Sequence, residues 1–325
     1  MSALPTRAVL TIAAGRESYL AFAANLARSF RHWHADGRIA FQLVTDLDLP
    51  LDPDLDFVRV HRAPPGSLGV SFTTKLSMDR FLSCDETLFV DADCLCTGPL
   101  DGVFDRFSGR DFSVIGREER EGENFGDIAH RCRLLGLPAT VRFCGSLYFL
   151  RRGPTCAAVL EYARGLVPRY AELGLVPLRG GVNEEPLLGL AMAKFGQAPV
   201  EDDGSVKADL MFFNADPEVD VLRGRARAYN FPGRPKTYPE WRIPDEARPR
   251  LVHFMGGLTA YPPYTSEALC LRLTQASGWP GWAARAWSGL SLVAAHRLRV
   301  LAKALGRPVY QKLFGARPVR TSDRE

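Results

Sequence analysis

The feature that most constrains this 325-residue chain is the alternation of apolar and amphipathic segments in its first half. The run Ala8–Ala14 is almost entirely apolar, as in a strand that is buried on both faces. A helix capped by Ser18 is predicted to follow, because apolar residues then recur at helical spacing. Further strands are predicted at Ile39–Val44, Phe57–Val60 and Thr87–Val90. Strands that alternate with helices favour a mostly parallel sheet flanked by helices, and therefore an α/β fold.

The second half of the chain is less regular. A strand is predicted at Val141–Leu150 and a helix at Pro154–Arg169. Another helix is predicted after Asn183, a favourable N-cap residue that two acids follow in the first turn. Arg250–Phe254 is predicted to be the last strand, and a short helix is expected to end at Phe81.

The overall composition is that of a soluble globular enzyme, with 46% hydrophobic and 24% charged residues. No apolar run approaches the roughly 18 residues of a membrane span, and the first residues lack the layout of a signal peptide. We therefore expect a cytoplasmic protein. The seven cysteines are an odd number at irregular spacing, which predicts free thiols. Cys94 and Cys96 are interpreted as small buried residues, because no further ligands for a zinc site stand at matching spacing.

The net charge of +4 is unevenly distributed. The segment from Arg285 to Glu325 carries nine Lys and Arg residues and only two acids, so the rest of the chain is slightly acidic. This distribution indicates a near-neutral body with a basic tail. It argues against a nucleic-acid-binding protein, which would carry a basic face on the body itself.

The pattern Asp-x-Asp occurs four times, and only one copy directly follows a predicted buried strand. That copy is Asp91 and Asp93, after Thr87–Val90. Ligands bind at the carboxyl ends of strands in sheets of this kind. Two acids placed there repel each other unless a cation lies between them, and carboxylates suit Mg²⁺ or Mn²⁺, which in turn bind diphosphates. The copies between residues 46 and 56 are interpreted as solvated turn acids.

Four segments in a fixed order make the sequence resemble GT-A nucleotide-sugar transferases, particularly glycosyltransferase family 8 and its bacterial relatives. They are Thr74–Asp93, which precedes and includes the paired acids, and the stretches Phe143-Cys-Gly-Ser-Leu-Tyr-Phe149, Asn183-Glu-Glu-Pro-Leu187 and His253-Phe-Met-Gly-Gly257. The resemblance covers roughly residues 8 to 260. The chain departs from the family at Cys144, where the family has Asn, and at Thr259–Tyr261, where the family has Lys-Pro-Trp.

The resemblance implies a Rossmann-like GT-A domain over residues 1–277. The charge distribution and the spacing of apolar residues predict a basic helical tail over residues 278–325. The resemblance implies a site for Mn²⁺ or Mg²⁺ formed by Asp91, Asp93 and His253. It also implies a donor site, for which the candidates are Thr11, Ala13, Tyr19, Lys75, Asp91, Ala92, Gly256 and Gly257. For Tyr19, Lys75 and the two glycines, core packing, a surface position and a simple turn remain the respective alternatives.

The acids of the third segment are the catalytic candidates, and they are Glu184 and Glu185 together with Asn183. One of the two carboxylates would lie beside the anomeric carbon of the sugar, as nucleophile, base or hydroxyl anchor. The alternative is that both acids only complement the dipole at the start of the helix.

The expected activity is transfer of a hexose from a UDP-sugar to a hydroxyl of a glycan or lipid-linked acceptor, with retention as the resemblance implies, in cell-surface polysaccharide or glycolipid synthesis. Two alternatives remain. A sugar nucleotidyltransferase would carry a glycine-rich loop after its first strand, and Ala14–Ser18 contains too few glycines. A non-catalytic nucleotide-sugar-binding protein could share the same fold.

The basic tail has the pattern of an amphipathic helix. Apolar residues recur at positions 290, 294, 298, 301 and 305, while His296, Arg299, Lys303 and Arg307 gather on another face. Such a helix suits an anionic membrane surface, so the protein is expected to be peripheral on the inner face of the cell membrane. The alternative is a helix that packs on the catalytic domain.

Overall fold

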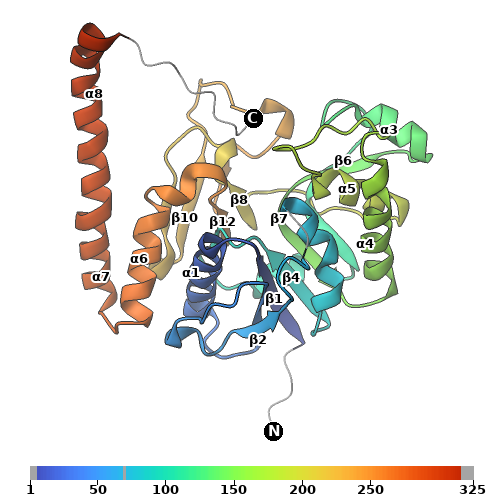
Figure 1. Cartoon of the computed structure of the whole chain (residues 1–325), viewed down its shortest axis with the longest axis horizontal. Helices are drawn as coiled ribbons and strands as arrows, with labels where there is room; N and C mark the ends of the chain where they lie inside the picture. Colours follow the sequence, from blue (N-terminus) through green and yellow to red (C-terminus); the bar gives the residue numbers. More distant parts are fainter. Residues whose placement is uncertain (1–5, 69–70, 316–325) are drawn as a thin grey trace.

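The computed structural model describes residues 6–68 and 71–315, and Figure 1 shows a central sheet with helices on both sides. The sheet has six strands in the order β3-β2-β1-β4-β7-β6. The first four strands are parallel, whereas β7 runs antiparallel to both of its neighbours. The bounds are β1 (Arg7–Ala13), β2 (Ile39–Thr45), β3 (Arg59–Arg62), β4 (Glu86–Val90), β6 (Phe112–Glu119) and β7 (Thr140–Arg151). The predicted α/β fold with a mainly parallel sheet is confirmed.

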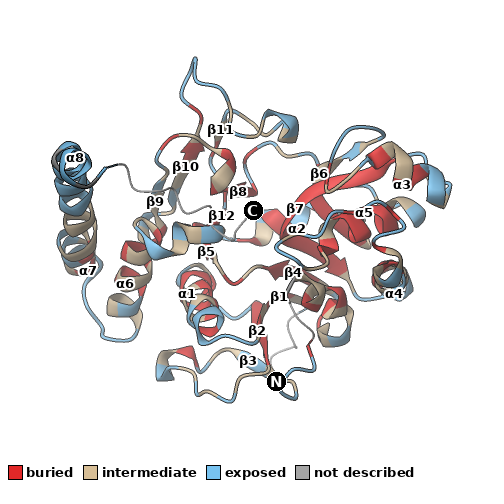
Figure 2. Ribbon diagram, turned by 45° about the horizontal axis from the view of Figure 1, so that its top comes forward, coloured by how far each residue is buried: buried red, intermediate tan, exposed pale blue. Residues whose placement is uncertain are grey.

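Helices cover both faces of this sheet, which explains why its strands are nearly continuous apolar runs. Alternate residues of β1 enter different cores: Val9 packs with α1 (Glu17–Trp33) and α2 (Asp101–Arg106). Leu10 packs on the other face with α4 (Pro154–Leu166) and α5 (Glu184–Lys194). Figure 2 shows the buried residues concentrated in this sheet.

Two small sheets are formed mainly by strands that follow the central sheet in the chain. The first has the order β5-β12-β8, with β5 (Cys94–Cys96), β12 (Leu251–His253) and β8 (Lys207–Asp209). The second has the order β11-β10-β9, with β11 (Glu246–Ala247), β10 (Arg225–Tyr229) and β9 (Glu218–Asp220). A short helix α3 (Ile128–Leu135) lies between β6 and β7 in the chain.

The carboxyl-terminal part consists of helices. α6 (Tyr264–Gln275) and α7 (Gly281–Ser288) pack against each other, and Arg285 of α7 forms ion pairs with Glu267 and Asp220. A π-helical turn (Gly289–Ala294) then leads into α8 (Ala295–Phe314), which stands beside the body in Figure 1. No helix among the described residues is both long enough and apolar enough to span a membrane.

Several sequence predictions need correction. α1 begins at Glu17 without a side-chain cap, so Ser18 is inside the helix and does not cap it. The segment before Phe81 is a 3₁₀-helix, Ser71–Phe81. The loop acids Asp52 and Asp54 are not simply solvated, because both form ion pairs with the buried guanidinium of Arg28. That cation needs counter-charges, since an unpaired buried charge is strongly destabilising.

The close contact between α5 and β7 generates a stability prediction. A Cβ at Gly189 of α5 would lie 2.1 Å from the carbonyl oxygen of Val141, so α5 can approach β7 only because this position is glycine. Gly189→Ala should therefore destabilise the fold by about 1–3 kcal/mol, through displacement of the helix. Gly165→Ala in α4 is the matched control, because a Cβ there meets no atom and should stabilise the helix by about 0.5–1 kcal/mol. Urea unfolding would measure both changes, and equal effects would contradict this packing argument.

Candidate active site

The candidate site lies where β4 ends and the small β5-β12-β8 sheet begins. Asp91 directly follows β4, and its backbone N–H donates to the carbonyl oxygen of Ser146 on β7 (3.0 Å). His253 is the last residue of β12, which pairs with β5 just beyond Asp93. The following residue, Phe254, donates its N–H to the carbonyl oxygen of Asp93 (3.0 Å). These backbone contacts hold the two predicted acids and the predicted histidine in one place.

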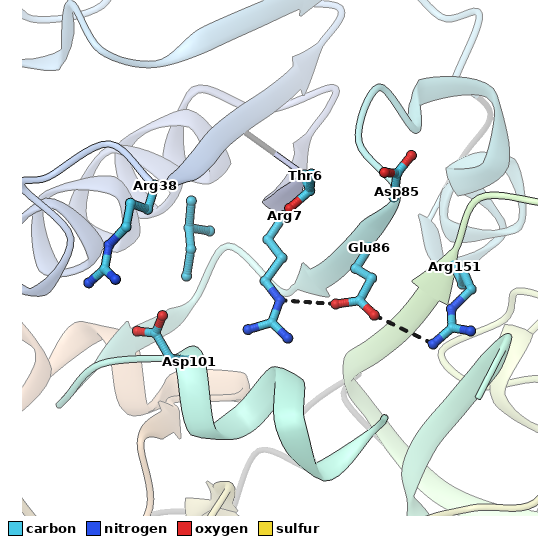
Figure 3. A pocket seen from close by; sticks show the side chains of 8 residues that line it. Thr6, Arg7, Arg38, Asp85, Glu86, Asp101 and Arg151 are labelled. Atoms are coloured by element: carbon cyan, nitrogen blue, oxygen red, sulfur yellow. Dashed lines mark hydrogen bonds and ion pairs between the residues drawn. The ribbon is translucent and has the colours of Figure 1, made fainter. Parts of the chain in front are cut away.

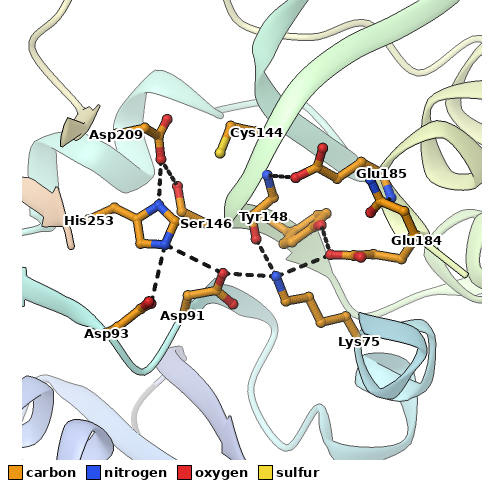
Figure 4. Close-up of polar contacts among 12 residues, drawn as sticks. Lys75, Asp91, Asp93, Cys144, Ser146, Tyr148, Glu184, Glu185, Asp209 and His253 are labelled. Atoms are coloured by element: carbon orange, nitrogen blue, oxygen red, sulfur yellow. Dashed lines mark hydrogen bonds and ion pairs between the residues drawn. The ribbon is translucent and has the colours of Figure 1, made fainter. Parts of the chain in front are cut away.

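The three predicted metal ligands converge in the structure (Figure 4). His253 Nε2 lies 3.2 Å from Asp93 Oδ1 and 4.0 Å from Asp91 Oδ2. Carboxylate oxygens and an imidazole nitrogen form a donor set that suits a divalent cation such as Mn²⁺. The residues present therefore fit the metal that the sequence implied.

Lys75 lies among the acids and links the candidate metal ligands to the acids at the start of α5. Its ammonium group donates to Asp91 Oδ2 (2.8 Å) and to the carbonyl oxygen of Gly145 (2.7 Å), and it lies 3.1 Å from Glu184 Oε1. Although burial alone would lower it, the pKa of Lys75 is raised by Asp91 and Glu184. An ammonium has three donors, and all three have partners here, so the predicted contact with phosphate would require Lys75 to release one of them.

The predicted catalytic acids begin α5, and Asn183 caps the helix as predicted, since its side chain accepts from Glu185 N–H (3.1 Å). Glu184 is buried, and its Oε1 also accepts from the Tyr148 hydroxyl (2.9 Å). Glu185 is more accessible, and its Oε1 accepts from the N–H of Gly145 (2.7 Å). The structure therefore separates two acids that the sequence left equivalent: Glu184 pairs with Lys75, whereas Glu185 is held by a backbone amide.

The site shifts the ionisation of its members in different directions. Burial raises the pKa of Glu185 to about 7, and the charge of Glu184 acts in the same direction. Burial also raises the pKa of Asp91 despite Lys75. Burial alone would also raise the pKa of Asp93, but the charge of His253, its hydrogen bond and the charge of Lys75 together hold this pKa below its ordinary value. Burial alone would lower the pKa of His253, but the neighbouring carboxylates raise it well above its ordinary value.

The candidate donor residues on the amino-terminal side lie around the end of β1. Thr11 and Ala13 are buried in the strand, which pairs with β2 through Ala13 but with β4 only through Leu10. The last residues of β1 therefore extend beyond β4. Ala92 packs in the same small cluster as Ala13. Tyr19 is 41% exposed at the start of α1, so the core-packing alternative for Tyr19 is wrong.

Gly256 and Gly257 follow the histidine and begin a 3₁₀-helix, Gly256–Ala260. Gly256 has a φ of +69°, which favours glycine, and a Cβ there would meet no atom within 4 Å. The backbone of this turn is thus open to approach by a ligand, although its contact with a diphosphate stays a prediction.

Sequence reasoning missed a second group of buried polar residues beside the histidine. His253 Nδ1 lies 2.7 Å from Asp209 Oδ1, and Lys207 Nζ lies 2.6 Å from Asp209 Oδ2. The signal in the sequence was weak: a Lys-Ala-Asp triplet between Val206 and Leu210, which alternates in the manner of a strand. Its partners stand more than 40 residues away in the chain, so no local pattern connects them.

The seven cysteines are all free and buried, as predicted. Cys94 and Cys144 nevertheless lie near the histidine. The ligand atoms of Asp93, Cys94 and His253 lie within 4.8 Å of one another, and those of Cys144, Asp209 and His253 do so as well. Burial raises the pKa of the Cys144 thiol to about 12, which keeps it neutral.

A separate hollow of about 550 Å³ lies at the opposite edge of the central sheet, where β1 and β4 begin (Figure 3). Three of its charged side chains pair with one another, because Glu86 binds both Arg7 and Arg151. The hollow therefore lies away from the convergence of Asp91, Asp93 and His253, and its lining is that of a solvated ion-pair network.

Comparison with known proteins finds similarity in structure only. No protein-family model and no curated protein sequence matches this chain. A solved structure of the galactosyltransferase LgtC in complex with donor and acceptor sugar analogs matches 80% of this chain and 95% of its own, with a TM-score of 0.52 and 15% identity. The glycosyltransferase GlyE of Streptococcus pneumoniae TIGR4 matches 61% of this chain and 45% of its own, with a TM-score of 0.41 and 16% identity.

The match to LgtC shows the class of fold. The chain has the GT-A fold of nucleotide-sugar glycosyltransferases, and it resembles family 8 in the order of its segments, as the sequence indicated. At 15% identity the match shows the fold and leaves the activity to be argued from the site. The similarity to GlyE is too low to add to this argument.

The raised pKa of Glu185 predicts a pH dependence of stability. The folded state holds this proton up to about pH 7, whereas the ordinary value is 4.5, so stability is lost as the pH rises between these values. Glu185→Gln keeps the hydrogen bond from Gly145 and removes the titration. With a chelator present, the stability of Glu185→Gln relative to the wild type should therefore increase from pH 5 to pH 8, by at most about 3 kcal/mol in the free energy of unfolding. Melting temperatures of the two proteins at each pH measure this change. Glu161→Gln on the exposed face of α4 is the control; a constant difference for Glu185→Gln would contradict the raised pKa.

Proposed function

We propose that this protein is a metal-dependent glycosyltransferase that transfers a hexose from a UDP-sugar to a hydroxyl acceptor. The observation that carries the proposal is the convergence of Asp91, Asp93 and His253 at the carboxyl edge of the sheet, with an acid pair opposite. In an α/β sheet this edge is where nucleotides bind.

Asp91, Asp93 and His253 would hold Mn²⁺ or Mg²⁺. When bound, the ion supplies positive charge that stabilises the leaving diphosphate. The backbone around Gly256 and Gly257 would approach the diphosphate, and the exposed ring of Tyr19 would contact the nucleoside. Thr11, Ala13 and Ala92 are buried, so they would shape the floor beneath the nucleoside.

Glu185 is the acid that we place beside the anomeric carbon, because Glu184 is occupied by Lys75 and Tyr148. The N–H of Gly145 orients the Glu185 carboxylate, which would stabilise positive charge on the sugar as the bond to the diphosphate breaks. Among the described residues, Asn183 Nδ2 and Glu184 Oε2 are buried without a hydrogen-bond partner. Retention of configuration is part of the proposal.

The acceptor would be a glycan or a lipid-linked glycan, in cell-surface polysaccharide or glycolipid synthesis. The nucleotidyltransferase alternative is weakened by the loop after β1, because the amide of Gly15 already donates to Asp46 Oδ1 (2.8 Å) and is not free for a triphosphate. A non-catalytic protein would not need Glu185 with a raised pKa opposite the metal ligands.

UDP binding should depend on a divalent cation held by Asp93. Calorimetry of the wild type should show much tighter UDP binding with Mn²⁺ than with chelator, because the carboxylates that would hold the ion would place its positive charge beside the diphosphate. In Asp93→Ala the affinity with Mn²⁺ should fall to the metal-free level.

Asp56→Ala is the matched control, since Asp56 belongs to another Asp-x-Asp pair and is exposed. It should bind UDP as the wild type does. Hydrolysis of a UDP-hexose with Mn²⁺, which a nucleotidyltransferase or a binding protein would not perform, completes the test. Unchanged UDP affinity in Asp93→Ala would refute the metal assignment.

We propose further that α8 attaches the protein to an anionic membrane surface. Leu298, Leu301 and Leu305 are 65%, 55% and 70% exposed, although they form one apolar stripe at helical spacing. The helix carries no acidic residue. It approaches the body near its start, where the rings of His296 and Tyr261 lie 5.4 Å apart, and Figure 2 shows it exposed beyond that. Trp282 and Trp287 of α7 are also exposed, and tryptophan favours membrane interfaces. The tail residues after 315 lie outside the described residues.

Removal of residues 295–325 should abolish binding to anionic vesicles and leave UDP-hexose hydrolysis intact. This cut keeps α7, whose Arg285 pairs with Glu267, so the body should stay folded. Each basic residue near the surface contributes about 1 kcal/mol, so binding of the full chain should weaken as salt is added. Co-sedimentation with phosphatidylglycerol vesicles measures this, with phosphatidylcholine vesicles as the control. A full chain that stays in the supernatant at low salt would contradict the proposal.

A further inference from the structure

The small β5-β12-β8 sheet places His253 between two side chains that point to the same face. His253 is in register with Cys94 on β5 and with Asp209 on β8. Residues in register on neighbouring strands point to the same side of a sheet. The strand pairing itself, rather than a flexible loop, therefore brings the carboxylate of Asp209 beside the imidazole.

The two nitrogens of His253 face different partners. Nδ1 lies 2.7 Å from Asp209 Oδ1, whereas Nε2 lies 3.2 Å from Asp93 Oδ1 (Figure 4). An ionised carboxylate can only accept, so Nδ1 is the donor in this bond. A histidine that binds a cation must be neutral, and with its remaining proton held on Nδ1 by Asp209 the ring would present the lone pair of Nε2 toward Asp91 and Asp93, where the cation would lie.

Asp209 is itself held from two directions. Lys207 Nζ lies 2.6 Å from Oδ2, and the Ser146 hydroxyl donates to Oδ1 (2.7 Å). The same ammonium donates to Ser146 Oγ (3.0 Å) and to the carbonyl oxygen of Cys144 (2.9 Å). All of these residues are buried. A buried ion pair contributes little net stability compared with apolar residues of the same volume. An arrangement this complete is therefore better explained by what it does to the histidine.

We propose that Asp209 is a positioning residue that fixes the tautomer and the ring orientation of His253, and that Lys207 and Ser146 hold Asp209 in place. The proposal rests on the function proposed above, because it assumes that His253 binds the cation. It assigns a role to a buried ion pair that would otherwise have none in the site.

The experiment is a double-mutant cycle on Mn²⁺ affinity, read from the electron paramagnetic resonance signal of free Mn²⁺ in the folded full chain. Asp209→Ala should weaken Mn²⁺ binding by about 10- to 100-fold. His253→Ala should weaken it at least as much. The double variant should bind no more weakly than His253→Ala alone, because Asp209 acts only through the ring.

Asp209→Asn supplies the conservative variant, since its amide oxygen can still accept from Nδ1. It should recover most of the Mn²⁺ affinity that Asp209→Ala loses, and it keeps the test usable if Asp209→Ala does not fold. In that case, the Mn²⁺ affinity of Asp209→Asn should lie within a few fold of that of the wild type when His253 is present. In the His253→Ala background, Asp209→Asn should cause no further loss of Mn²⁺ affinity.

The outcomes separate this inference from the proposed function. If His253→Ala loses Mn²⁺ affinity and Asp209→Ala does not, the positioning role is refuted while the metal site stands. Additive losses would also refute it, because Asp209 would then act without the histidine. If neither His253→Ala nor Asp93→Ala changes Mn²⁺ affinity, the metal assignment itself fails, and the positioning role fails with it.

Discussion

The candidate site depends on one partly buried ammonium group. Lys75 comes from the 3₁₀-helix Ser71–Phe81 and binds Asp91 at the end of β4, Gly145 on β7 and Glu184 at the start of α5. Carboxylates this close raise one another's pKa and destabilise the fold unless a positive charge offsets them. Because its three partners come from three elements, Lys75 also fixes where the strand end, the middle of β7 and the helix start lie relative to one another.

Gly145 completes this junction through its backbone. Its carbonyl oxygen accepts from Lys75 and its N–H donates to Glu185, so the backbone of one residue binds both an ammonium group and a carboxylate. A Cβ at this position would lie 2.4 Å from the Tyr148 hydroxyl and 2.9 Å from Glu184 Oε1. Any larger residue here would therefore displace side chains that form the site. The adjacent Cys144, where family 8 has Asn, leaves an apolar thiol at a position that the family gives to an amide.

The parts of this site that could be predicted from the sequence are those with a local pattern. Asp91 and Asp93 follow a buried strand, and Asn183 precedes a helix, so each is visible within a few residues. The antiparallel direction of β7 could not be predicted, because an apolar run does not indicate how its strand is oriented relative to its neighbours. The partners of Arg28, Lys75 and Asp209 could not be predicted either, since each buried charge is satisfied by residues far away in the chain. The two acids of α5 looked equivalent in sequence, and only Lys75 and Gly145 distinguish them.

The balance of charge in the completed site bears on why a cation would be needed at all. Two ammonium groups, Lys75 and Lys207, and the imidazole of His253, whose pKa is raised, stand among five carboxylates, which are those of Asp91, Asp93, Glu184, Glu185 and Asp209. Both ammonium groups are already committed to these carboxylates; Lys207 is buried and Lys75 is partly buried. A diphosphate brings further negative charge to this excess, and in a partly buried site that repulsion is poorly screened. Because Lys75 is already paired with carboxylates, a divalent cation at Asp91, Asp93 and His253 would supply the positive charge that an anionic donor needs, and the reaction proposed above would then depend on metal.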